Sequence, residues 1–147
     1  MKILVRKASK GDTSSILELL YEMGRPKPKN NSEKVRFSGK ITRYLLEPDK
    51  KILVAVSNSQ VVGLVSIVFL QRLNQTKLEM YIPELVVAKK YHRHGIGKSL
   101  INACIKMAKK NRCYRIRLES GYQRKTAHIF YKRLGFKQRA LTYTLKI

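Results

Sequence analysis

The stretch His92-Arg93-His94-Gly95-Ile96-Gly97-Lys98-Ser99-Leu100 follows the apolar run Leu85-Val86-Val87. This order predicts a strand that runs into a short basic turn, which in turn opens an amphipathic helix. The two glycines let the backbone come close to a ligand, because neither has a Cβ. The free N–H groups of a first helical turn point at the same place and favour an anion, and the flanking arginine and lysine add positive charge. The stretch therefore predicts a cradle for a diphosphate.

Two other anion cradles are excluded by the spacing of the glycines. A P-loop needs a glycine five residues before the Gly-Lys-Ser triplet, and His92 stands at that position. The dinucleotide fingerprint needs three glycines near the start of a βαβ unit, whereas this chain has two, and they come late in the sequence.

Length and composition predict a single domain over residues 1–147 with a core of its own. No run of 18 or more apolar residues occurs, so we expect no membrane span. The apolar stretch at the N-terminus is too short for a signal peptide. Cys104 and Cys113 lack metal-ligand spacing, so we expect free thiols, no metal, and a reducing, cytoplasmic location.

The formal net charge of +23 is distributed unevenly. Residues 1–84 hold 15 Lys/Arg and 8 Asp/Glu, whereas residues 85–147 hold 17 Lys/Arg and one acid, Glu119. The predicted cradle lies in the basic half, where a positive field attracts a polyanionic ligand. The alternative is that the lysines only solvate the surface.

The periodicity of apolar residues, together with turn and cap residues, predicts alternating strands and helices. Asp12 and Ser32 are the expected N-caps of the first two helices, and Pro83 is expected to mark a bulge because proline donates no ladder hydrogen bond. Strands are expected at 2–8, 51–57, 60–70, 78–87, 114–119 and 139–147, and helices at 13–23, 32–47, 98–110 and 125–134.

With the cradle between the fourth strand and the third helix, this order resembles the GNAT superfamily of N-acetyltransferases over essentially the whole chain. Residues 92–97 match Arg/Gln-x-x-Gly-x-Gly/Ala except that His92 replaces the first residue. The terminal Ala-x-x-x-Tyr-x-x-x-Gly-Phe motif is matched by Ala127, Tyr131, Gly135 and Phe136. The resemblance implies an α/β fold with a mixed, mostly antiparallel twisted sheet of six to seven strands, splayed between strands four and five and flanked by four helices.

The resemblance also implies acetyl-CoA as cosubstrate. Backbone amides from Arg93 to Ser99 would hold its pyrophosphate, and Leu85, Val86 and Val87 would pair with the pantetheine arm like an added strand. The matching positions in the family assign the cofactor site to residues Leu85, Val86, Val87, His92, Arg93, His94, Gly95, Ile96, Gly97, Lys98, Ser99, Arg124 and Phe130.

Acetyl transfer to an amine needs a base for the amine, a donor for the developing oxyanion and a proton for the leaving thiolate. The family motif makes Tyr131 the candidate general acid, and a backbone N–H near Val87 the candidate oxyanion donor. Glu84, beside Pro83, is the candidate base. Glu79, Tyr81, Glu119 and a bound water stay as alternatives.

The acceptor is expected to dock against the first two helices and the loop between them. An acceptor with a carboxylate, phosphate or phosphonate suits the basic chain, while Glu18 and Glu22 could form a local acidic patch for a cationic one. A peptide amine remains open, as does the choice between monomer and homodimer. The alternatives to an enzyme are a basic protein that binds nucleic acid or regulates, and a catalytically silent acyl-CoA-binding module.

Overall fold

The computed structural model of the protein covers residues 1–147. The chain divides into two compact units, Met1–Arg117 and Leu118–Ile147. No helix in either unit combines the length and apolar character needed to cross a membrane.

The first unit contains five strands, three α-helices and two short 3-10 turns, and a sixth strand ends at the first residue of the second unit. In chain order they are β1 (Leu4–Lys7), η1 (Lys10–Asp12), α1 (Thr13–Glu22), α2 (Asn31–Leu46), β2 (Lys50–Ser57), β3 (Gln60–Leu70), β4 (Glu79–Ile82), β5 (Leu85–Val87), η2 (Lys89–Tyr91), α3 (Ile96–Lys110) and β6 (Arg115–Leu118). This order confirms the expected mixed α/β class.

The six strands form one sheet in the order β1-β2-β3-β4-β6, with β5 also paired to β3. β2 pairs antiparallel with β1 and with β3, and β3 also pairs antiparallel with both β4 and β5. The β2–β3 hairpin turns at Asn58 and Ser59, both with positive φ of 48° and 64°, as a tight type I′ turn requires. The mostly antiparallel sheet is therefore as expected.

A one-residue bulge at Pro83 divides the fourth predicted strand into β4 and β5. On β3, Val68 pairs with Tyr81 and Val65 pairs with Leu85, so two residues of β3 face three residues of the bulged chain. β6 lies next to β4 and does not pair with β5. The predicted splay therefore begins at this proline, and the far edge of β5 has no strand partner.

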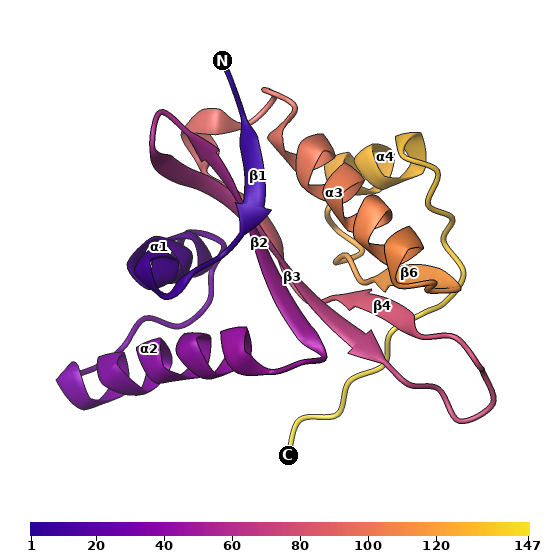
Figure 1. Ribbon diagram of the computed structural model, residues 1–147, viewed down its shortest axis with the longest axis horizontal. Helices are drawn as coiled ribbons and strands as arrows, with labels where there is room; N and C mark the ends of the chain where they lie inside the picture. The colour runs from indigo at the N-terminus through magenta and orange to yellow at the C-terminus, as the bar shows by residue number, and fades with distance from the viewer. The chain divides into compact units, whose positions relative to one another are not determined.

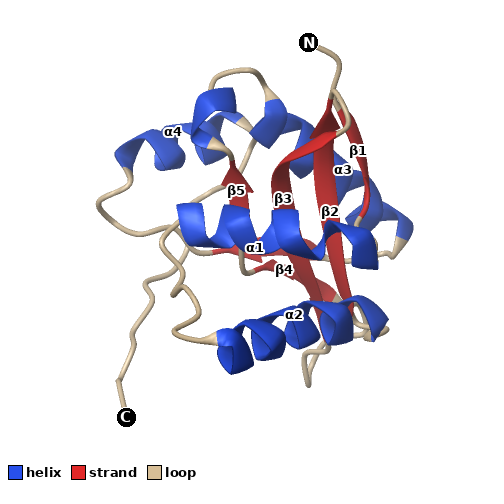
Figure 2. Cartoon of the chain, turned by 90° about the vertical axis from the view of Figure 1, so that its left-hand side faces the viewer, coloured by secondary structure: helices blue, strands red, loops and turns tan.

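Helices cover both faces of the sheet in the first unit. Figure 1 shows α1 and α2 on one face and α3 on the other, and Figure 2 shows β5 beside β3 behind α1. Apolar side chains from α1 and the sheet form the core of the first face, namely Ile16, Leu19, Ile52, Val54, Leu64 and Val86. On the other face, a Cβ at Gly63 would lie 3.2 Å from side-chain atoms of Ile96 and Leu100, so this glycine allows α3 to pack closely.

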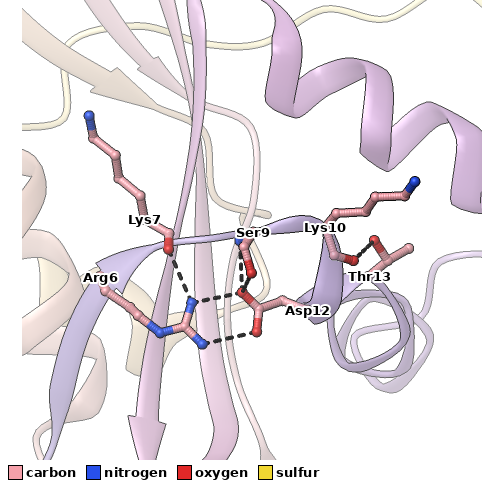
Figure 3. Close-up of polar contacts among 6 residues, drawn as sticks. All are labelled: Arg6, Lys7, Ser9, Lys10, Asp12 and Thr13. Carbon is pink, nitrogen blue, oxygen red and sulfur yellow. Dashed lines mark hydrogen bonds and ion pairs between the residues drawn. The ribbon is translucent and has the colours of Figure 1, made fainter.

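The residues that start α1 and α2 differ in part from those expected. Asp12 stands at the N-cap of α1, but its carboxylate makes no cap bond there and instead accepts from Ser9 N–H at 2.8 Å and from both terminal nitrogens of Arg6 (Figure 3). Asn30, rather than Ser32, caps α2, because its Oδ1 accepts the Glu33 N–H at 2.9 Å. Asp12 and Asn30 are both polar residues at the start of a helix, and the local geometry decides which N–H donor each side chain reaches.

The second unit contains α4 (Lys125–Arg133), which Gly135 closes with a φ of +96°. The expectation of a last strand at 139–147 is wrong, because these residues form neither strand nor helix. The alternating apolar side chains that suggested a strand are largely exposed, at Leu141 72%, Tyr143 87%, Leu145 85% and Ile147 115%. A strand pattern yields a strand only where a neighbour pairs with its backbone.

Candidate active site

The turn between β5 and α3 presents a run of unused backbone donors. Arg93 and Gly95 both adopt left-handed backbone conformations, with φ of 64° and 77°. The N–H groups of residues 93–98 donate to no acceptor within the protein. Before this run the His92 N–H donates to Lys89 O at 3.2 Å, and after it the Ser99 N–H of α3 donates to Gly95 O at 3.0 Å. Such a nest at the start of a 15-residue helix fits an anion with several oxygens.

Two histidines hold the turn in shape rather than leave their rings free for chemistry. His92 Nε2 lies 2.7 Å from Val87 O, and His94 Nδ1 lies 2.9 Å from His92 O. Because a carbonyl oxygen only accepts, each of these ring nitrogens donates. His92, the residue that departs from the motif, therefore ties the turn to the end of β5.

Helix α1 also anchors this region. Glu22 Oε1 accepts the backbone N–H of Lys89, in η2, at 2.7 Å. Ile96 and Leu100 are buried at 1% and 0%, so the first turns of α3 are fixed by packing against the sheet. The cradle is thus supported from both faces of the sheet.

The free edge of β5 offers backbone groups to a ligand. Ala88 N–H donates to Val62 O and Ser66 N–H donates to Glu84 O, both at 2.9 Å, so residues 84, 86 and 88 face β3. Alternation then points the backbone groups of Leu85 and Val87 away from β3. Val87 O is already used by His92, which leaves the two N–H groups and Leu85 O on this edge.

Glu84 lies in the bulge and is held by three contacts. Its N–H donates to Ser66 Oγ at 2.9 Å, while the Ser66 hydroxyl donates to its carboxylate. Arg25, from the loop after α1, pairs with the same carboxylate at 3.2 Å. The Glu84 side chain remains 25% exposed. It is therefore a fixed carboxylate at the bulge, open to an incoming group.

Tyr44 of α2 lies near this carboxylate and cannot replace it as a base. Its hydroxyl donates to Ile67 O at 3.0 Å. Burial, and then the negative charge of Glu84, raise the pKa of Tyr44 to about 12. The phenol stays protonated at neutral pH.

Glu79, an alternative base in the sequence analysis, is fully buried at 0% exposure and engaged with arginines. Arg117 Nε lies 3.2 Å from its carboxylate, Arg72 Nη1 lies 3.7 Å away, and Arg115 Nε also pairs with it. Burial raises its pKa, but the hydrogen bonds from Arg115 and Arg117 outweigh that effect and hold the pKa below its usual range. Glu79 is thus an ionised anchor and a weak proton acceptor.

Tyr131 lies on α4 in the second unit, between two aromatic rings. The ring centroids of Phe130 and Phe136 are 5.2 Å and 5.7 Å away, both in edge-to-face geometry. Burial raises the pKa of the Tyr131 phenol, and the charge of Arg124 opposes this only in part. A phenol kept protonated suits a proton donor. Nearby, His128 Nε2 lies 2.8 Å from Gly121 O, so this histidine stabilises the approach to α4.

Sequence reasoning did not identify Ser66, Arg25 or Tyr44 as neighbours of Glu84. Ser66 is a polar residue in an otherwise apolar run of β3, which was a usable signal. The thiols behave as expected, since Cys104 and Cys113 are both free and burial raises the pKa of Cys104 to about 12. No group of three or more His, Cys, Asp or Glu side chains gathers as a metal site.

Comparison with known proteins gives the family. The model of the acetyltransferase (GNAT) family matches residues 15–136. The aminoalkylphosphonate N-acetyltransferase of Salmonella typhimurium is 29% identical over 140 residues, which cover 95% of this chain and 88% of the relative. An uncharacterized N-acetyltransferase of Methanocaldococcus jannaschii is 31% identical over 92% of this chain, and the match spans 61% of the length of that relative.

The fold agrees with solved structures as well. The crystal structure of an acetyltransferase from Trypanosoma brucei superposes with a TM-score of 0.81, covering 99% of this chain and 100% of the other at 23% sequence identity. This likeness concerns the fold alone.

Proposed function

Because the chain belongs to the acetyltransferase (GNAT) family and is an acyltransferase, we propose that it moves an acetyl group from acetyl-CoA directly to a primary amine of a small molecule or peptide. The observation that carries the proposal is the run of free N–H groups at residues 93–98, next to an unpaired edge of β5. We also propose that residues 1–147 act as one N-acetyltransferase domain in the cytoplasm, where Cys104 and Cys113 stay reduced.

The cradle residues fit a diphosphate, because they supply unused N–H groups and include two cationic residues, Arg93 and Lys98. The N–H groups of Leu85 and Val87 are free to bind an extended amide-containing arm along β5. Val86 contributes through packing, since its backbone faces β3 and its side chain is buried. Further proposed contacts to the cofactor come from His92, His94, Gly95, Ile96, Gly97, Ser99, Arg124 and Phe130.

Acetyl-CoA, when bound, supplies the thioester carbonyl that the amine attacks and the thiolate that leaves. In the proposed mechanism, Glu84 accepts a proton from the ammonium group of the acceptor, directly or through a water, so that the neutral amine can attack, and Ser66 keeps the Glu84 carboxylate in place. A backbone N–H at Val87 or next to it stabilises the developing oxyanion. The Tyr131 phenol, protonated at neutral pH, gives its proton to the leaving sulfur.

For the acceptor, we propose a short amine that also carries an acid group, in the class of aminoalkylphosphonates or amino acids. The chain has a net charge of +23, which attracts anions and repels polycations. The name of the Salmonella relative, an aminoalkylphosphonate N-acetyltransferase, agrees with such an acceptor.

The test is the release of free thiol from acetyl-CoA in the presence of amino acids, aminoalkylphosphonates, aminoglycosides, polyamines and N-terminal peptides, together with calorimetry of acetyl-CoA binding. Thiol release with one amine class would support the proposal and identify the acceptor. Acetyl-CoA binding without release from any amine would favour the silent module. Salt-sensitive retention on DNA or RNA, without acetyl-CoA binding, would replace the enzyme with a nucleic-acid-binding protein.

A further inference from the structure

Three arginines converge on one buried carboxylate at the start of β4 and β6. Arg72 comes from the loop between β3 and β4, while Arg115 and Arg117 are alternate residues of β6. All three pair with Glu79, which is 0% exposed. One carboxylate balances one guanidinium, so Glu79 alone leaves the positive charge of this cluster in excess.

Glu79 leaves the terminal nitrogens of Arg115 and Arg117 available to another acceptor. Arg115 and Arg117 each contact it through Nε, so the terminal nitrogens of both guanidinium groups are not used by Glu79. These terminal nitrogens form the planar fork that matches phosphonate, phosphate and carboxylate oxygens. The three side chains remain accessible, with exposures of 46% for Arg72, 45% for Arg115 and 35% for Arg117.

Aromatic rings fix the positions of the two β6 guanidinium groups. The Arg117 guanidinium carbon lies 4.4 Å from the ring centroid of Tyr81, and that of Arg115 lies 5.2 Å from the ring of Tyr114. The Tyr114 hydroxyl also donates to Glu79 at 3.4 Å. An arginine that only interacts with solvent does not require a buried carboxylate partner or a stacked aromatic ring. These contacts therefore indicate that the two guanidinium groups are held in place.

The cluster lies on the same face of the sheet as Glu84. Tyr81, which stacks on Arg117, pairs with Val68 of β3. Glu84 is held by Ser66, two residues before Val68 on the same face. Residues two apart on a strand are about 7 Å apart, so the positions of β3 beside Glu84 and beside Tyr81 are neighbours on this face.

We propose that Arg72, Arg115 and Arg117, held by Glu79, form an anion subsite that takes the acid group of the acceptor while its amine lies at Glu84. The inference rests on the proposed function and adds the residues that would select an acceptor with an acid group. The acid is a phosphonate, phosphate or carboxylate, and it is joined to the amine by a short chain.

The test compares the wild-type protein with Arg117→Gln and Arg72→Gln. Arg72 lies in a loop and is the most remote from Glu79, so its variant guards against a folding defect at Arg117. Lys109→Gln removes one exposed charge of α3 and serves as the matched control. The acceptors are 2-aminoethylphosphonate, β-alanine and propylamine, and circular dichroism checks the fold of each variant.

We expect kcat/KM for the better of the two acidic amines to fall at least about tenfold in Arg117→Gln, mainly through KM, because a charge-assisted hydrogen bond is lost. Arg72→Gln also lowers kcat/KM for this acidic amine. The kcat/KM for propylamine does not change in either variant, and Lys109→Gln leaves kcat/KM unchanged for all acceptors. The wild-type preference between phosphonate and carboxylate identifies the acid group. Equal losses for acidic amines and propylamine would overturn the subsite and leave the arginines a structural role.

A second measurement separates this inference from the proposed function. Ethylphosphonate has no amine to acetylate, so its binding by calorimetry does not depend on turnover. Weaker binding in Arg117→Gln and Arg72→Gln would support the anion subsite even if no amine were acetylated. Unchanged binding in both variants, or no binding to the wild type of either ethylphosphonate or propionate, would overturn the subsite while leaving the acetyltransferase reaction intact.

Discussion

The carboxylate of Glu84 forms an ion pair with Arg25, with 3.2 Å between Arg25 Nη2 and Glu84 Oε2. The contact joins the loop after α1 to the bulge in the sheet. In the proposed mechanism, the ammonium of an acceptor would compete with this guanidinium for the carboxylate. Arg25 is 52% exposed, so the pair is weak enough for a substrate to displace it.

If Glu84 is the base, Glu84→Gln lowers kcat by about 100-fold or more, because the amide cannot accept the proton of the amine. Acetyl-CoA affinity stays unchanged, since Glu84 lies at the bulge and not in the cradle. Steady-state kinetics and calorimetry check both points. Asp49→Asn, which removes an exposed carboxylate between α2 and β2, is the matched control. Full activity of Glu84→Gln would shift the role of base to a water or to another residue.

Tyr131→Phe is expected to lower turnover by about 100-fold with little change in the Kd for acetyl-CoA, because only the proton donor is lost. Since burial raises the pKa of the Tyr131 phenol, the wild-type enzyme should show no loss of activity from its ionisation until the pH exceeds about 10. The pH profile of kcat checks this. Equal turnover of the two proteins would remove Tyr131 from the mechanism.

Gly97→Glu should weaken acetyl-CoA binding by at least about 100-fold, because a carboxylate next to the free N–H groups repels the pyrophosphate and fills its place. Calorimetry measures the loss. Gly39→Glu is the control, since a Cβ at Gly39 of α2 meets nothing within 4 Å and the same charge is added elsewhere. Unchanged affinity in Gly97→Glu would move the pyrophosphate to another site.

Asp12→Asn should lower the free energy of unfolding by about 2 kcal/mol at pH 7, because it removes the ionised acceptor of Arg6 and Ser9. The hydrogen bond from Arg6 holds the pKa of Asp12 below its ordinary value of 3.8, despite burial. A lowered pKa in the folded state stabilises the protein above the ordinary value and loses that effect as the pH falls. Urea unfolding should therefore give a difference between the two proteins that shrinks below about pH 4. A constant difference at all pH values would contradict this.

Local patterns in the sequence predicted the parts of the site that depend on neighbouring residues. The cradle follows from glycines and basic residues at a helix start, and the bulge follows from a proline within a strand. Both are properties of a few consecutive residues, and the structure has the helix start and the bulge at these positions.

The contacts that escaped prediction join residues far apart in the chain. Glu79 meets Arg115 and Arg117 only because β4 and β6 become neighbours across the intervening helix α3. The alternation Arg115-Ile116-Arg117 places two arginines on one face of a strand, but nothing in it indicates which carboxylate lies opposite. The failed strand at 139–147 has the same cause, because a period of two does not reveal whether a pairing partner exists.

The bulge at Pro83 has a consequence for the thermodynamics of binding. Since proline lacks an N–H and the register shifts by one residue there, the free edge of β5 exists before any ligand arrives. A cosubstrate arm that adds to this edge does not require any strands to separate first, so the protein loses little conformational entropy on binding. Association should then be governed by diffusion and by the positive field of the chain, and its rate constant should fall steeply as salt is added.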